Sequence, residues 1–199
     1  MKNSGIMKTE TISRRGFLKK TGLIGAGLAT TLISEQAKAS NGFAKQLFHN
    51  VREPKIISFR NLHTGEIFSG AYRVGDQYIN ESFQQISGVL RDHRTGDKHK
   101  IDPELVEYVH MLKVRANSDN DFEILSGYRS PKTNAMLRRR TSGVAKQSLH
   151  MQGKAVDLRL AGYNIKRLRQ DAQNLKLGGV GYYSDSGFIH LDTGPVRYW

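Results

Sequence analysis

The chain has 199 residues, contains no cysteine and carries a formal net charge of +13. Without cysteine it cannot form disulfides, thiolate metal ligands, a cysteine nucleophile or a lipid anchor on cysteine. The charge favours contact with polyanions, but no basic motif interleaved with aromatic residues points to nucleic acid, so we expect no nucleic-acid partner.

The first segment, residues 1–39, has the features of an export signal. The stretch "SRRGFLK" at 13–19 matches the twin-arginine export pattern at every position. A short apolar run follows, and "AKA" at 37–39 is the small-x-small pattern of a signal-peptidase site. The run is too short and too rich in glycine for a membrane-spanning helix. We therefore predict a twin-arginine signal peptide and a location in the periplasm or cell envelope; the alternative is a charged cytosolic helix.

The rest of the chain is long enough for one compact domain with its own core. Residues 1–39 contain seven Lys/Arg and two acidic residues, so the remainder keeps a charge of about +8. In a cell envelope this charge favours anionic wall polymers and lipid head groups. We predict a linker or short helix over residues 40–54, a domain over residues 55–199, no membrane span in the mature form and a monomer.

Alternating apolar residues around Thr64-Gly65 predict a β-hairpin at the start of the domain. Apolar residues then recur at helical spacing over residues 79–92. The Asp-Pro pair at 102–103 predicts a second helix, with the aspartate as N-cap and the proline in the first turn. This helix is expected to end near Asn117 and to point three apolar residues inward: Leu105, Val109 and Leu112.

The second half of the domain alternates short strands with helices. The patterns predict strands at 122–125, 155–160, 179–183 and 188–192, and helices at 131–140 and 164–175. Helices dominate early and short strands gather late. This order predicts an α+β fold in which a small antiparallel sheet packs against helices.

His150 and His190 are the histidines with a carboxylate at a useful spacing. Side chains alternate along a strand, so His190 and Asp192 share one face. A loop relaxed by Gly153 can bring His150 to Asp157. Two histidines and one aspartate are a suitable ligand set for one Zn²⁺, with a position left for water. From spacing alone, a metal site and ordinary polar residues at a strand start are equally acceptable.

A zinc site would supply hydrolytic chemistry without a nucleophilic side chain. The metal lowers the pKa of a water and polarises a carbonyl. Because cysteine is absent, nitrogen and oxygen ligands are the available ones.

Four stretches carry a resemblance to a known family: "NLHTGE" at 61–66, "SGYRS" at 126–130, "SGVAKQSLHMQGKAVD" at 142–157 and "IHLDTGPVRYW" at 189–199. The chain resembles the zinc peptidases of the D-alanyl-D-alanine carboxypeptidase and L-alanyl-D-glutamate peptidase group, whose fold also underlies hedgehog domains. More closely it resembles the YcbK-type murein endopeptidases. The resemblance covers the whole mature domain and includes the twin-arginine presequence.

The resemblance implies a ligand set for one zinc ion per chain: His150, Asp157 and His190. It also implies that Ser148 orients the loop through a hydrogen bond and contributes to the substrate site. Gly153 and Ala155 match the same motif and are small where the backbone is expected to approach the metal.

The general base is not fixed by the resemblance. Many relatives place an acidic residue three positions before the last histidine, or a histidine two before it, whereas this chain has Gly187 and Phe188 there. Asp192 is the nearest replacement. It is either the base that moves a proton from water to the leaving amine or a partner that fixes the tautomer of His190. Asp185 is a weaker candidate and is expected to be a turn residue.

Arg129 follows a predicted strand end near the proposed cleft. The resemblance implies that it holds a substrate carboxylate or stabilises the developing oxyanion. The alternative is a surface ion pair. Tyr128 is expected to line the same groove and to contact substrate.

Together these features lead to one interpretation and two alternatives. The resemblance implies a zinc-dependent endopeptidase that hydrolyses peptidoglycan cross-links, in particular those between two diaminopimelate residues. One alternative is a D,D- or L,D-carboxypeptidase that trims stem peptides. The other is a catalytically silent module that binds peptidoglycan. This alternative stays open because the chain lacks a carboxylate shortly before His190.

Overall fold

The computed structural model describes residues 53–141 and 143–199. The predicted signal peptide, and the predicted linker up to residue 52, lie outside the described residues. The strands are β1 (Pro54–Asn61), β2 (Ile67–Val74), β3 (Gln77–Tyr78), β4 (Phe122–Ser126), β5 (Ala155–Leu160), β6 (Gly179–Tyr183), β7 (Phe188–Asp192) and β8 (Arg197–Tyr198). The helices are α2 (Asn80–Val89), α3 (Pro103–Ala116), α4 (Pro131–Arg140), the 3-10 turn η1 (Leu149–Gln152) and α5 (Ile165–Leu175).

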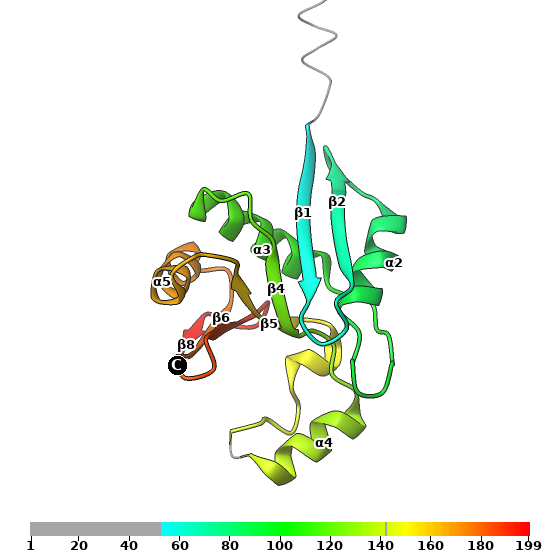
Figure 1. Cartoon of the computed structure of the whole chain (residues 1–199), viewed down its shortest axis with the longest axis vertical. Coiled ribbons are helices and arrows are strands. Elements are labelled where there is room, and N and C mark those ends of the chain that lie inside the picture. Colours follow the sequence, from blue (N-terminus) through cyan, green and yellow to red (C-terminus); the bar gives the residue numbers. More distant parts are fainter. Residues whose placement is uncertain (1–52, 142) are drawn as a thin grey trace, which may run out of the picture. The chain divides into compact units, whose positions relative to one another are not determined.

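The described strands form one sheet in the order β3-β2-β1-β4-β5-β7-β6-β8. The α+β prediction is confirmed, and the predicted hairpin is β1–β2. The sheet is larger than the small antiparallel sheet we expected, because β1 pairs with β4 and so joins the hairpin to the later strands. It is also mixed, since β1 pairs with β4 and β6 with β8 in parallel. Figure 1 shows β1 and β2 running vertically in the upper part of the view, and β5, β6 and β8 to their lower left.

The predicted helix starts are confirmed by their caps. The side chains of Asp102, Ser130 and Asn164 each accept a backbone N–H from the first turn of α3, α4 and α5. Each such cap satisfies one of the amide groups that a helix N-terminus leaves without an internal partner. The C-terminal end of α3 also lies where it was predicted, at Asn117, whose φ of 47° is left-handed.

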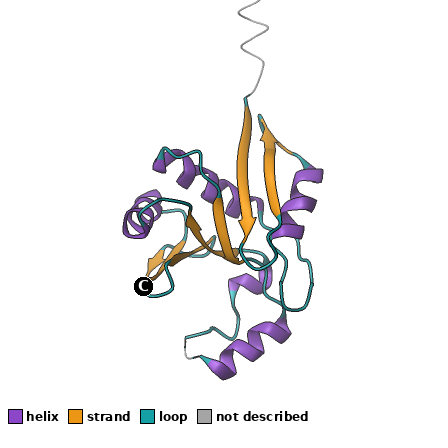
Figure 2. Ribbon diagram, in the orientation of Figure 1, coloured by secondary structure: helices purple, strands orange, loops and turns teal. Residues whose placement is uncertain are grey.

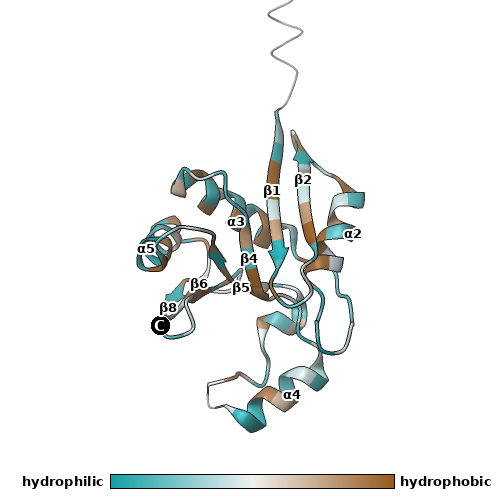
Figure 3. Ribbon diagram, viewed as in Figure 1, coloured by the Kyte–Doolittle hydropathy of each residue, from teal (hydrophilic) through white to brown (hydrophobic). Residues whose placement is uncertain are grey.

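One apolar core joins the helices to the sheet. Helix α3 packs on α5, and α5 packs on β5, β6 and β7, while α2 packs on β1 and β2. In Figure 3, brown, hydrophobic segments alternate with paler and teal ones along β1 and β4. Leu158 and Ile189 are fully buried in this core, so one face of β5 and β7 is covered by helices.

Helix α4 contributes little to that core and extends away from the sheet in Figure 2. Its last turn carries Arg138, Arg139 and Arg140, all exposed. Within the described residues, no helix combines the length and apolar character needed to cross a membrane.

Candidate active site

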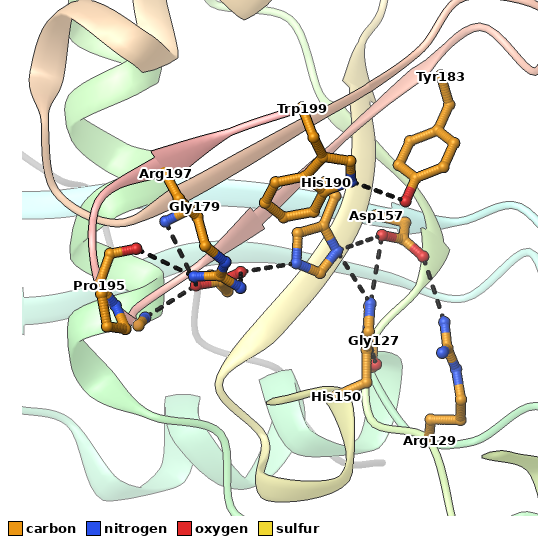
Figure 4. A network of polar contacts seen from close by, with 12 residues as sticks. Gly127, Arg129, His150, Asp157, Gly179, Tyr183, His190, Pro195, Arg197 and Trp199 are labelled. Carbon is orange, nitrogen blue, oxygen red and sulfur yellow. Dashed lines mark hydrogen bonds and ion pairs between the residues drawn. The ribbon is translucent and has the colours of Figure 1, made fainter. Parts of the chain in front are cut away.

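The predicted ligands His150, Asp157 and His190 meet at one point. One ligand atom from each lies within 4.8 Å of the others. Asp157 and His190 are direct cross-strand partners on β5 and β7, and η1 supplies His150. The alternation of side chains puts both strand residues on the face away from the helical core. Figure 4 shows the three side chains converging.

Hydrogen bonds fix which nitrogen of each histidine faces this point. His150 donates from Nδ1 to the carbonyl oxygen of Gly127 at 2.7 Å, so its Nε2 lone pair faces inward. His190 contacts a carboxylate oxygen of Asp192 through Nε2 at 2.9 Å, which leaves Nδ1 facing inward. The inward atoms lie close together, with His190 Nδ1 2.8 Å from Asp157 Oδ1 and 3.2 Å from His150 Nε2.

Three inward atoms with lone pairs repel one another unless a proton or a cation lies between them. Two imidazole nitrogens and one carboxylate oxygen are a donor set that Zn²⁺ accepts. The remaining ring nitrogens are already held by a carbonyl and a carboxylate, as is usual for histidines that bind metals. The residues present therefore fit a metal ion.

The pKa values of the cluster follow from burial and mutual contact. Burial lowers the pKa of His150 and so favours its neutral form. Burial also acts against the charge on His190, but hydrogen bonds to Asp157 and Asp192 outweigh it and raise the pKa of His190 to about 9. Burial opposes the charge on Asp157 as well, yet His150 and His190 hold its pKa well below the ordinary value. Asp157 is thus an anion in a buried site that favours a cation.

Asp192 lies behind His190, away from the other ligands. It is fully buried, and its carboxylate accepts hydrogen bonds from the backbone of Gly179 and Gly194 and from the guanidinium of Arg197. Burial opposes its charge, but its bonds with His190, Arg197 and Gly194 outweigh this and lower its pKa to about 2. Of the two predicted roles, the geometry supports the partner that orients His190. A general base would have to act on the side of the imidazole where Nδ1 faces the other ligands, whereas Asp192 lies on the Nε2 side.

Arg129 lies on the other side of the cluster and contacts Asp157 Oδ2 through Nη2 at 3.5 Å. Only 12% of its side chain is exposed, so the surface ion pair that we kept as the alternative does not describe it. Its Nε atom is buried and has no hydrogen-bond partner among the described residues. Burial lowers the pKa of Arg129. An unused donor on a buried cation is suited to an acceptor on a ligand.

A cleft of about 290 Å³ opens over the cluster. Arg129 and Ser148 line it, as predicted. Ser148 makes no side-chain cap on η1, so the predicted orienting hydrogen bond is not seen there. Asp185 is an exposed turn residue, as expected.

The prediction for Tyr128 is not supported, since Tyr128 is not among the residues that line the cleft. Its ring stacks on His99, with the ring centroids 4.9 Å apart. Gly127 on one side of it turns its carbonyl to His150, and Arg129 on the other side reaches Asp157. The intervening side chain therefore points elsewhere.

Gly153 is needed for a different reason than the predicted approach to the metal. Its φ of +68° is left-handed, and a Cβ there would lie 2.2 Å from the carbonyl oxygen of Lys100. The backbone N–H of Asp102 also donates to the Gly153 carbonyl at 3.0 Å. The glycine thus joins η1 to the start of α3. Ala155 lies opposite Asp192 in the pairing of β5 with β7.

Sequence reasoning missed Arg197 and Trp199, which strand β8 brings to the site. Arg197 contacts both carboxylate oxygens of Asp192, at 3.1 and 2.7 Å. The Trp199 ring centroid lies 5.4 Å from that of His190. Alternation in "VRYW" could have placed the two on one face, but not beside β6, because that pairing is long-range.

Comparisons with known proteins identify the family of the chain. A family model described as "Peptidoglycan L,D-endopeptidase MepK" matches residues 49–199. "Probable peptidoglycan L,D-endopeptidase MepK" of Haemophilus influenzae is 43% identical over 148 residues, which cover 74% of this chain and 80% of that protein. "Peptidoglycan L,D-endopeptidase MepK" of Escherichia coli strain K12 is 39% identical over 146 residues, covering 73% and 80%.

Proposed function

Because the chain belongs to the MepK family of peptidoglycan L,D-endopeptidases and is therefore a peptidase, we propose that it is a zinc enzyme that hydrolyses peptide cross-links in peptidoglycan. The bonds that we assign to it join two diaminopimelate residues. The family is metal-dependent, and the cluster of His150, Asp157 and His190 is the candidate site in the described part of the chain.

The observation that carries the proposal is the orientation of the three ligands. Gly127 and Asp192 each hold one nitrogen of a histidine, so the two free nitrogens and Asp157 Oδ1 face one another in a cleft. A module that only bound peptidoglycan would not need this arrangement of ligands. A zinc ion held there would polarise the scissile carbonyl and provide a water of lowered pKa.

The protein's own groups then have distinct tasks. Asp192 holds His190 in one tautomer and one orientation, because its carboxylate is itself fixed by Arg197 and two backbone amides. Arg129 fixes the second oxygen of Asp157 and offers its unpaired Nε to a substrate carboxylate or to the developing oxyanion.

We also propose that the protein acts in the periplasm or cell envelope after export by the twin-arginine route. The pattern at 13–19 and the excess of basic residues support this location. A positive surface would favour residence on an anionic wall, and salt would weaken that attraction.

The test is a digestion of purified muropeptides by the zinc-loaded protein, followed by mass spectrometry. Cross-linked dimers joined through two diaminopimelate residues should be cut to monomers, and removal of zinc with a chelator should stop the reaction. Dimers that stay intact while still binding the protein would contradict the enzymatic proposal and favour the binding module.

Monomeric stem peptides serve as the second substrate in the same assay. An endopeptidase leaves them unchanged, whereas a carboxypeptidase shortens them by one residue. Faster trimming of monomers than cleavage of dimers would therefore replace the endopeptidase assignment with the carboxypeptidase one.

A further inference from the structure

Trp199 is a large aromatic residue in the cleft that has no part in the metal site. It is the single tryptophan of the chain, and 47% of it is exposed. Its ring lies beside that of His190 and lines the cleft. An exposed indole next to a reactive centre is a contact surface that a ligand can cover.

The position of this indole is fixed from several sides. The Trp199 backbone bonds to both neighbours of Gly181 on β6, with N–H to the Val180 carbonyl at 3.2 Å and carbonyl to the Tyr182 N–H at 2.9 Å. The indole Nε1 donates to the hydroxyl of Tyr183 at 3.2 Å. The guanidinium of Arg197 lies 5.0 Å from the ring centroid. A ring held in this way is ordered before any ligand arrives.

Gly181 provides the space that the indole occupies. It is the cross-strand partner of His190, and a Cβ on it would lie 2.7 Å from the ring of Trp199. The indole therefore lies directly against strand β6, next to a metal ligand. Any side chain at position 181 would displace it from this place.

Two further rings extend the same surface. Tyr183 and Phe188 stack with their centroids 4.7 Å apart and both line the cleft. We call Trp199, Tyr183 and Phe188 the aromatic wall. Figure 4 shows Trp199 and Tyr183 on one side of the ligand cluster and Arg129 on another. The cleft thus combines an apolar surface with a cation, separated by the metal site.

We propose that the aromatic wall binds the aliphatic part of the substrate residue next to the scissile bond, with Trp199 as the main contact. This inference rests on the proposed function and deepens it by naming what recognises the substrate. A peptide whose residues carry both methylene chains and carboxylates matches the wall and Arg129 at once. Trp199 is accordingly a specificity-determining residue that contacts substrate and not the metal.

Trp199→Leu tests this with Tyr198→Leu as the matched control. Tyr198 is the preceding residue and the last of β8, but its hydroxyl donates to the Gln173 carbonyl of α5, on the helix-covered face. We expect Trp199→Leu to raise KM for cross-linked dimers about tenfold, with kcat and zinc content close to those of the wild type. Tyr198→Leu should leave KM unchanged. An unchanged KM in Trp199→Leu would overturn the inference.

Fluorescence of the wild-type protein gives a second readout that needs no variant. Because Trp199 is the single tryptophan, tryptophan emission reports only the surroundings of this residue in the aromatic wall. Adding dimeric muropeptide to the zinc-loaded protein should shift emission to the blue and reduce acrylamide quenching within the first seconds, before product accumulates. No shift at a saturating peptide concentration would overturn the inference.

The two proposals can fail separately. If the wild type cleaves dimers but shows neither the fluorescence shift nor the KM effect of Trp199→Leu, the proposed function stands and the inference is wrong. If no cleavage occurs, the proposed function is wrong, and a fluorescence shift on peptide addition still supports the wall as a peptide contact.

Discussion

The two faces of strands β5 and β7 have different roles. On one face Val156, Leu158 and Ile189 are buried under helices in the apolar core. On the other, Asp157 and His190 lie side by side in the candidate metal site. Along each strand, residues thus alternate between the apolar core and the candidate site.

This difference shows why the core also sets the geometry of the site. A shift of one residue in the pairing of β5 with β7 would move the ligands into the core and the apolar residues into the cleft. Burial of Leu158 and Ile189 therefore fixes the register that places Asp157 opposite His190. Variants on each face should separate stability from catalysis.

The largest effect is expected from the ligands. His150→Ala, Asp157→Ala and His190→Ala should each lose bound zinc and reduce hydrolysis to the background level, because two ligands hold the metal poorly. Circular dichroism should show that the fold is kept. Zinc content by atomic absorption and the muropeptide assay check this; a variant with full zinc and normal turnover would remove its residue from the site.

A change on the opposite face should lower stability and spare the chemistry. Leu158→Ala creates a cavity in the core and should reduce the free energy of unfolding by about 2–5 kcal/mol. Urea unfolding measures the loss. The folded fraction should keep one zinc per chain and its normal kcat, and a loss of zinc from folded protein would show that the faces are not separable in this way.

Asp192→Asn tests a residue on the site face that does not bind the metal. If Asp192 orients His190, the variant should bind zinc about 10–100-fold more weakly yet keep most of its kcat once saturated with zinc. Competition with a chelator gives the affinity, and initial rates at saturating zinc give kcat. A large loss of kcat at full zinc occupancy would instead make Asp192 the general base.

Asp92 lies outside β5 and β7 and stabilises the segment that carries Arg129, because its carboxylate accepts the backbone N–H of Ser130 at 2.9 Å. Burial opposes its charge, but hydrogen bonds from Thr133, Ser130 and the backbone of Arg94 outweigh it and hold its pKa well below the ordinary value. A lowered pKa contributes stability that is fully present above the pKa of the unfolded carboxyl and is lost as pH falls below it. We expect Asp92→Asn to cost about 1.5 kcal/mol at neutral pH.

The same variant should show a flatter loss of stability in acid than the wild type. Urea unfolding between about pH 5 and pH 2.5 measures both slopes, with the wild type as reference. Equal slopes for the two proteins would mean that Asp92 does not contribute through its charge.

The local features of the fold and of the candidate site could be predicted from the sequence. Alternation along residues 188–192 put His190 and Asp192 on one face, and Asp102 marked the start of α3 correctly. These features depend on residues close together in the chain, so pattern and propensity are enough to find them.

The features that sequence reasoning missed depend on distant pairing. The parallel contact of β8 with β6 brings Trp199 onto Gly181, and no local pattern encodes that match. Tyr128 was expected in the groove, but its ring stacks on His99, because the direction of a side chain beyond a strand end is set by its neighbours. The role of Asp192 was left open for a similar reason, since the contact with Arg197 that favours the orienting role comes from β8.

Zinc-edge anomalous diffraction from crystals of the zinc-loaded protein tests the central claim most directly. We predict one anomalous peak per chain, about 2.0–2.2 Å from each of His150 Nε2, His190 Nδ1 and an oxygen of Asp157. A peak at another place in the chain, or coordination through the opposite nitrogen of either histidine, would contradict the site described here.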